Sequence, residues 1–117
     1  MATRYMFLIY SDESAMADVT PEQWDQMLQA HNAWGESVAA AGAAIVSGEA
    51  LAMSTTATTI RKGGGSPVVT DGPFAETKEG LGGYYVVDCA DLDQALALAH
   101  TLPANTVEVR PVIPTGP

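Results

Sequence analysis

The sequence RYMFLIY, residues 4–10, decides the fold that we expect for this chain. Successive side chains of a β-strand point to opposite faces of the sheet. The odd positions from Tyr5 to Ile9 and the even positions from Met6 to Tyr10 are all apolar or aromatic. Both faces of this strand therefore need a cover, which is typical of a strand in the middle of a sheet.

Two helices are expected around this strand. Thr20 is a good N-cap, Pro21 fits the first helical position, and Gln23 completes a capping box. The first helix is predicted over about residues 21–41, ending before Gly42, and its apolar stripe is Trp24, Met27, Leu28, Trp34 and Val38. Asp91 and Gln94 repeat the capping pattern for a second helix, whose predicted buried stripe is Leu92, Ala95, Leu96, Ala99 and Leu102.

The remaining segments predict strands. They are residues 43–50, a hairpin formed by 56–62 and 67–70 around a glycine-rich tip, residues 84–88, and residues 106–112. Gly48 weakens the strand prediction for residues 43–50 or indicates a bulge there. Glycines 80, 82 and 83 indicate a bulge or a close backbone approach. They lack the spacing of a nucleotide-binding loop, and no cofactor is expected. The predicted order is β-α-β-hairpin-β-α-β, with an acidic loop after the first strand.

This order predicts an α+β, ferredoxin-like subunit in which both helices cover one face of an antiparallel sheet. The first strand is apolar on both faces, so the opposite face of the sheet would remain uncovered in a single subunit. Packing against the sheet of a second copy is the simplest cover. The sequence therefore predicts a homodimer of the dimeric α/β barrel type.

Composition narrows the function classes. The chain has 117 residues, and we expect one domain over residues 1–117. Its net charge of -9 argues against direct nucleic-acid binding. One cysteine, no leader pattern and no long apolar run predict a cytoplasmic protein that does not enter a membrane. The few cations can still gather around a small ligand, and that ligand can be anionic.

Residues 69–79, VTDGPFAETKE, carry a resemblance to a known family. They resemble the signature of the DGPF branch of the YCII-related family. Further matches are spread over nearly the whole chain: residues 5–10, 48, 49 and 51, 58–61, 82–84, 88 and 91–93, and 107–111. The resemblance implies a dimeric α+β barrel. It also implies a superfamily that includes muconolactone-isomerase-like enzymes and small lyase-type proteins, and a branch whose genes often neighbour those of extracytoplasmic-function sigma factors.

The segment Asp71-Gly72-Pro73-Phe74 has two interpretations. In the first it is a rigid turn: Asp71 forms an Asx turn, the proline restricts Gly72, and Phe74 anchors the loop in apolar surroundings. In the second it is the wall of a ligand pocket. Asp71 then lies at the mouth of a cleft, and Phe74 with Glu76, Lys78 and Glu79 surrounds it.

His31 is the candidate for acid–base chemistry. It follows the spacing of the apolar stripe of the first helix, and a histidine there can act as a general acid or base beside a carboxylate such as Asp71. A histidine that is hydrogen-bonded at the margin of the core is the alternative. His100 fits a helix C-terminus, and the spacing of His and Cys residues predicts no metal site.

Two functions follow as hypotheses. The first is a small-molecule lyase or isomerase in which His31 shuttles a proton, Asp71 orients it, and Tyr10 or Arg61 polarises a carbonyl or carboxylate. The second is a non-catalytic dimer that binds a ligand or a partner and is accessory to sigma-factor-linked regulation. Close approach of His31 and Asp71 in one cleft would favour the first.

Overall fold

The fold is described by a computed structural model that covers residues 2–115. In chain order the elements are β1 (Thr3–Asp12), α1 (Glu13–Met16), α2 (Pro21–Ala40), β2 (Ala44–Ala50), the 3₁₀ turn η1 (Ser54–Thr56), β3 (Thr58–Arg61), β4 (Val68–Asp71), β5 (Glu79–Cys89), α3 (Leu92–Thr101) and β6 (Thr106–Pro111). The predicted order is confirmed. The additions are α1, a single turn capped by the Asp12 side chain where the sequence indicated only a loop, and the short turn η1 before β3.

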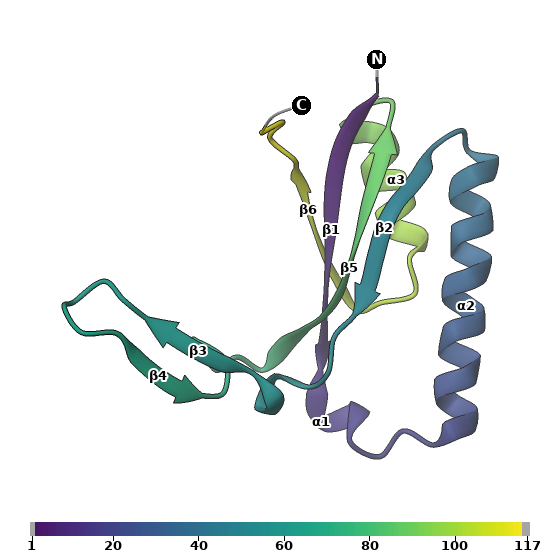
Figure 1. Ribbon diagram of the computed structural model, residues 1–117. Coiled ribbons are helices and arrows are strands. Elements are labelled where there is room, and N and C mark those ends of the chain that lie inside the picture. Colours follow the sequence, from purple (N-terminus) through teal and green to yellow (C-terminus); the bar gives the residue numbers. More distant parts are fainter. Residues whose placement is uncertain (1, 116–117) are drawn as a thin grey trace.

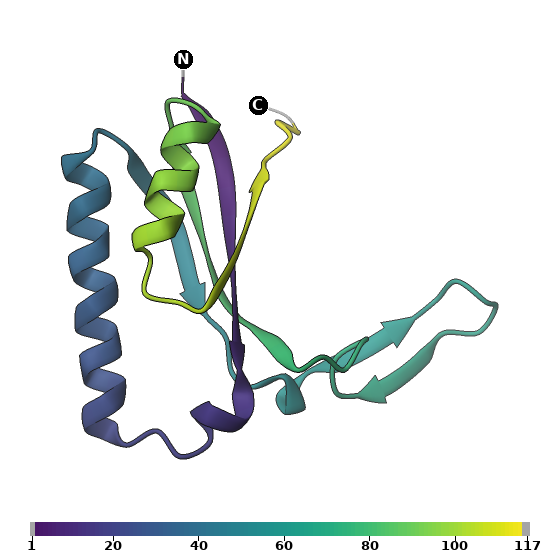
Figure 2. The ribbon, with the colours of Figure 1, turned by 180° about the vertical axis from the view of Figure 1, so that it is seen from behind.

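The main sheet has the strand order β2-β5-β1-β6, and every pair is antiparallel. Helices α2 and α3 lie on the same face of this sheet (Figures 1 and 2). The α+β, ferredoxin-like architecture is thus confirmed. Strands β3 and β4 form a separate two-stranded sheet that projects from the base of the main one (Figure 1).

The core lies between the helices and the face of the sheet that carries the odd residues of β1. Phe7 is completely buried there, and the ring of Trp34 from α2 lies 6.1 Å from its ring. Trp34 Nε1 donates a hydrogen bond to the carbonyl oxygen of Leu98 in α3, at 2.9 Å. This bond satisfies the one polar group of the indole and joins the two helices.

Both predicted helix stripes are wrong in part. In α2, Trp34 and Val38 are buried, but Trp24 and Leu28 are exposed because the N-terminal half of the helix borders a cavity. In α3 the buried residues are Ala95 and Leu98, followed by Leu102 just beyond the helix, whereas Leu92 and Leu96 are exposed. A helix of ten residues that touches the sheet along one line buries only a narrow stripe.

Bulges occur near the predicted positions. The register between β1 and β5 shifts between Ile9 and Tyr10, which leaves Gly82 without a partner and confirms the bulge in the glycine run. In β2 the shift falls between Ile45 and Ser47, two residues before the expected Gly48. Gly48 is instead a position of close approach, since a Cβ there would lie 2.5 Å from the ring of Tyr85.

The second face of the sheet is open in the single chain. Met6 and Leu8 of β1 lie there beside Val86 and Tyr84 of β5, and all four are only partly buried. Among the described residues, 2–115, no helix is long and apolar enough to span a membrane. The radius of gyration is 16.3 Å, against about 13 Å for a compact chain of this length. The projecting β3–β4 hairpin explains the difference (Figure 2).

Candidate functional site

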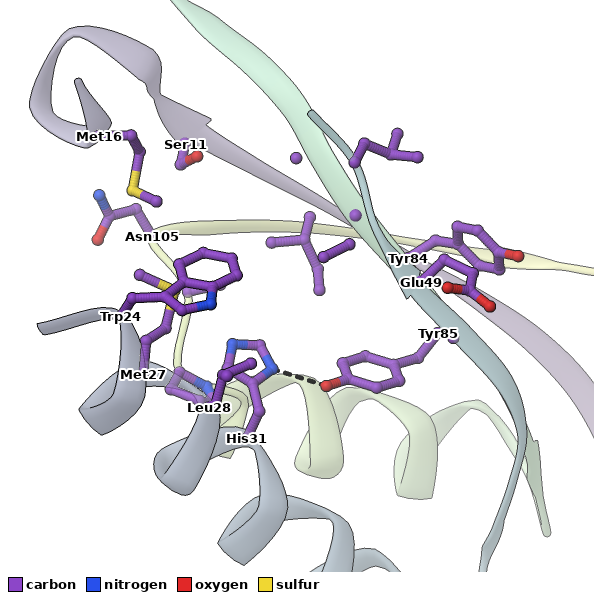
Figure 3. A pocket seen from close by; sticks show the side chains of 18 of the residues that line it. Ser11, Met16, Trp24, Met27, Leu28, His31, Glu49, Tyr84, Tyr85 and Asn105 are labelled. Carbon is purple, nitrogen blue, oxygen red and sulfur yellow. Dashed lines mark hydrogen bonds between the residues drawn. The ribbon is translucent and has the colours of Figure 1, made fainter. Parts of the chain in front are cut away.

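A cavity of about 420 Å³ lies between the N-terminal half of α2 and the helix-covered face of the sheet. Trp24, Met27, Leu28 and His31 contribute from α2, and Asn105 contributes from the segment before β6 (Figure 3). Ligand pockets for small molecules have volumes of roughly 300–1,000 Å³ and are mostly apolar with a few polar groups. The size and lining of this cavity fit that class.

Glycines create much of the space. Gly48 of β2 and Gly82 and Gly83 of β5 line the cavity, and none of them places a side chain in it. Gly83 pairs with Ile9 of β1, so the position opposite that isoleucine is empty. A Cβ on Gly83 would also lie 2.9 Å from the backbone oxygen of Glu49. The same glycines therefore permit close strand pairing and leave room above the sheet.

His31 and Tyr85 form the polar pair of this cavity. His31 Nδ1 lies 2.7 Å from the Tyr85 hydroxyl, and the two rings are stacked with centroids 5.8 Å apart (Figure 3). The ring of Trp34 lies 4.8 Å from that of Tyr85 on the core side. The tyrosine is thus fixed between the core and the cavity, and it orients the imidazole.

Both members of the pair are uncharged at neutral pH. Burial lowers the pKa of His31 below its usual value, and the nearby backbone carbonyl of Pro103 opposes this shift in part. Burial also raises the pKa of Tyr85. A neutral imidazole bonded to a neutral phenol can accept a proton at one atom and release one at another.

Few charges reach the cavity. Within residues 2–115, the lining contains no lysine or arginine. The Glu13 carboxylate accepts hydrogen bonds from the backbone N–H and the hydroxyl of Ser54. Glu49 lines the cavity, but Figure 3 shows its side chain directed away from the centre, beside Tyr84. The lining formed by the described residues therefore offers no cation to an anionic ligand, which the sequence left possible.

The predicted site residues are not gathered around His31. Asp71 ends β4 on the projecting hairpin and does not line the cavity, so one chain does not bring it to His31. Arg61 ends β3, and Phe74, Glu76 and Lys78 follow β4, all outside the cavity lining. Tyr10 lies on the open face of the sheet, where its hydroxyl donates to Glu108 at 3.0 Å. That bond raises the pKa of Tyr10.

The DGPF segment has the geometry of a rigid turn. Gly72 has a φ of 97°, which favours glycine, and its N–H donates to the Ala57 carbonyl at 2.6 Å. Thr59 Oγ1 donates to the Gly72 carbonyl at 2.7 Å, and Arg61 Nη2 donates to the Phe74 carbonyl at 2.5 Å. These bonds tie the turn to β3. The prediction that Phe74 anchors the loop in apolar surroundings is wrong for a single chain, because its side chain is 74% exposed and lies outside the hydrophobic core.

Sequence reasoning identified His31 but missed its partner. Tyr84 and Tyr85 are adjacent, and only the strand register shows that Tyr85 faces the helices. The sequence feature that could have identified Tyr85 is an aromatic residue with a hydroxyl group on a strand that also contains glycines. Among the described residues, no cluster of three or more His, Cys, Asp or Glu side chains has metal-binding geometry.

Comparison with known proteins finds similarity over nearly the whole chain. The family model of the YCII-related domain matches residues 3–115. An uncharacterised protein of Rhizobium meliloti (strain 1021) is 37% identical over 113 residues, covering 92% of this chain and 90% of that protein. The similarity therefore extends over both helices, the sheet and the projecting hairpin.

Proposed function

The chain belongs to the YCII-related family, and from its cavity we propose that it binds a small, uncharged, mostly apolar molecule and moves a proton on it. The observation that carries this proposal is the neutral His31–Tyr85 pair, hydrogen-bonded at 2.7 Å beside an apolar space of about 420 Å³. The activity class is a lyase or isomerase. Tyr85 takes the place that the sequence assigned to Asp71.

The chemistry follows from the two tautomers of His31. When Nδ1 carries the proton, it donates to the Tyr85 oxygen, and the tyrosine O–H is free to donate to a carbonyl oxygen of the ligand. Nε2 then carries no proton and would take the proton from the carbon next to that carbonyl. The electron pair of the broken C–H bond forms a C=C bond, and the negative charge on the oxygen is stabilised by Tyr85. The Pro103 carbonyl favours the resulting imidazolium.

A ring of five or six carbons with one ketone oxygen matches these requirements. Its apolar body would contact Trp24, Leu28 and Ile9, and its oxygen would meet the Tyr85 hydroxyl. Charged acids are disfavoured because no cation lines the cavity in the described part of the chain. Exchange of the proton next to the carbonyl for deuterium in D₂O is the activity that this proposal requires.

Ligand binding is tested with two tyrosine variants. We expect cyclic ketones such as cyclohexanone and 2-cyclohexenone to raise the melting temperature of the wild type. Tyr85→Phe should weaken this binding about 5- to 30-fold, because one hydrogen bond is worth about 1–2 kcal/mol. Tyr10→Phe is the matched control, since that hydroxyl lies on the open face of the sheet. Equal loss in both variants, or no shift in the wild type, would reject the cavity as the binding site.

The pH dependence of stability follows from His31. Its folded-state pKa lies below the ordinary value of 6.5, so near pH 6 the unfolded chain binds more protons than the folded one. The free energy of unfolding is therefore expected to fall as the pH drops below about 6.5. Three carboxylates with lowered pKa values lose their contribution to the free energy of unfolding only at more acidic pH: Asp12, Asp88 and Glu108.

Urea unfolding at pH 7.5 and pH 5.5 measures this dependence. His31→Gln should reduce the loss of stability between the two pH values, because glutamine does not titrate. His100→Gln serves as the control, since His100 is exposed in the last turn of α3. An unchanged pH dependence in His31→Gln would contradict burial of the neutral imidazole.

The second candidate is a non-catalytic dimer, accessory to sigma-factor-linked regulation, that uses the same fold to bind a ligand or a partner. The observation that favours it is the amount of apolar surface outside the cavity, on the open sheet face and on the hairpin. In either case we propose that two copies pack their open sheet faces together. This packing would cover Met6, Leu8, Tyr84 and Val86.

A further inference from the structure

The β3–β4 hairpin and its following turn, residues 58–75, form an arm that is unusually exposed. Ile60 and Val69 lie opposite one another on one face of the arm and are 58% and 61% exposed. Val68, on the opposite face of the arm, and Phe74, in the turn that follows β4, are 53% and 74% exposed. A two-stranded hairpin with apolar residues on both sides and no third strand is marginally stable in water. The arm needs a further contact to be well ordered.

The position of the arm indicates what it contacts. It leaves the base of the sheet on the side away from α2 in both views (Figures 1 and 2). The open sheet face also lies away from the helices. A second copy that packs on the open face would also lie away from the helices, and the arm leaves the sheet on the side away from α2.

Charge favours the same partner. The arm carries Arg61 and Lys62, two of the five cations of the chain, and only one of its 14 acidic residues, Asp71. The rest of the chain is strongly acidic. A basic arm on an acidic protein is attracted to another copy of that protein.

We propose that each arm clasps the second copy of the chain in the homodimer, so that Ile60, Val69 and Phe74 become buried against the partner. The proposal depends on the sheet-to-sheet dimer proposed above and adds a reciprocal contact to it. Stable dimers bury about 800 Å² on each subunit. The exposed apolar residues of the arm would add to the apolar surface of the open sheet face.

The proposal also gives the DGPF turn a role. Gly72 and the Arg61 bond to the Phe74 carbonyl hold the turn against β3, and the Phe74 side chain then points into solvent in the single chain. A rigid turn that presents an aromatic side chain is a good anchor for an interface, because little conformational freedom is lost on binding.

Dimerisation measured by analytical ultracentrifugation tests the arm. Ile60→Thr/Val69→Thr keeps strand propensity but removes apolar surface, and Phe74→Ser removes the anchor. We expect each to raise the dimer dissociation constant at least tenfold. Leu92→Gln/Leu96→Gln is the matched control: these leucines on α3 are 48% and 44% exposed on the helix-covered side, and dimerisation should not change.

The outcomes separate the arm from the dimer itself. A wild type that is monomeric at 100 µM would reject both proposals. A wild-type dimer that the arm variants leave unchanged, or that the α3 control weakens equally, would reject the arm contact alone. A photo-crosslinking residue at position 69 gives a direct check: cross-links to β1 or β5 of a second copy support the clasp, and cross-links only within one chain overturn it.

Discussion

Replacing Phe7 with alanine is expected to lower the free energy of unfolding by about 3–5 kcal/mol. Phe7 is 0% exposed and lies at the centre of the core, with the ring of Trp34 6.1 Å away. The residues around Phe7 belong to the sheet and to two helices, and hydrogen bonds hold these elements in place. The surrounding side chains therefore cannot move in to fill the cavity that the alanine would leave. Domains of this size have a free energy of unfolding of about 5–15 kcal/mol, so the variant would lose a large part of its stability.

Urea unfolding followed by circular dichroism measures this loss. Phe74→Ala is the matched control, because Phe74 is the second of two phenylalanines and is 74% exposed in the chain. Any effect of Phe74→Ala should vanish when the protein is diluted until it is monomeric, whereas the effect of Phe7→Ala should remain. A loss below about 1 kcal/mol for Phe7→Ala would contradict the assigned core.

Replacing His31 with glutamine is expected to slow deuterium exchange on a bound cyclic ketone by about 10²–10⁴-fold, the usual contribution of a positioned general base. The amide N–H of glutamine can still donate a hydrogen bond to the Tyr85 oxygen, which lies 2.7 Å from His31 Nδ1 in the wild type. It cannot take the proton from carbon. Binding of the ketone should therefore change much less than the rate.

Proton NMR in D₂O follows the disappearance of the signal next to the carbonyl. Tyr10→Phe should exchange at the wild-type rate, because its hydroxyl pairs with Glu108 outside the cavity. Two results would oppose the enzyme proposal: a wild type no faster than buffer, or equal rates in wild type and His31→Gln. A wild type that binds the ketone without exchange would support the non-catalytic dimer.

The difference between the expected and observed site has a physical cause. The DGPF residues were candidates for the site because their sequence predicts a distinctive turn. The structure contains this turn, with Gly72 at a φ of 97°. Its hydrogen bonds, however, connect it to β3 and not to α2. The number of residues between His31 and Asp71 does not show in which direction the hairpin projects from the sheet. That direction is decided by how the chain exits β2 and enters β5.

By itself, the sequence determined the order of elements, the helix N-cap at Thr20, the two-faced strand β1 and the candidate base His31. These features depend on local periodicity and on capping side chains a few residues apart. Only the tertiary structure decided that Tyr85 meets His31, that Trp24 and Leu28 border a cavity, and that the arm projects from the sheet. Strand register and helix position set these contacts, and both arise from packing between distant segments.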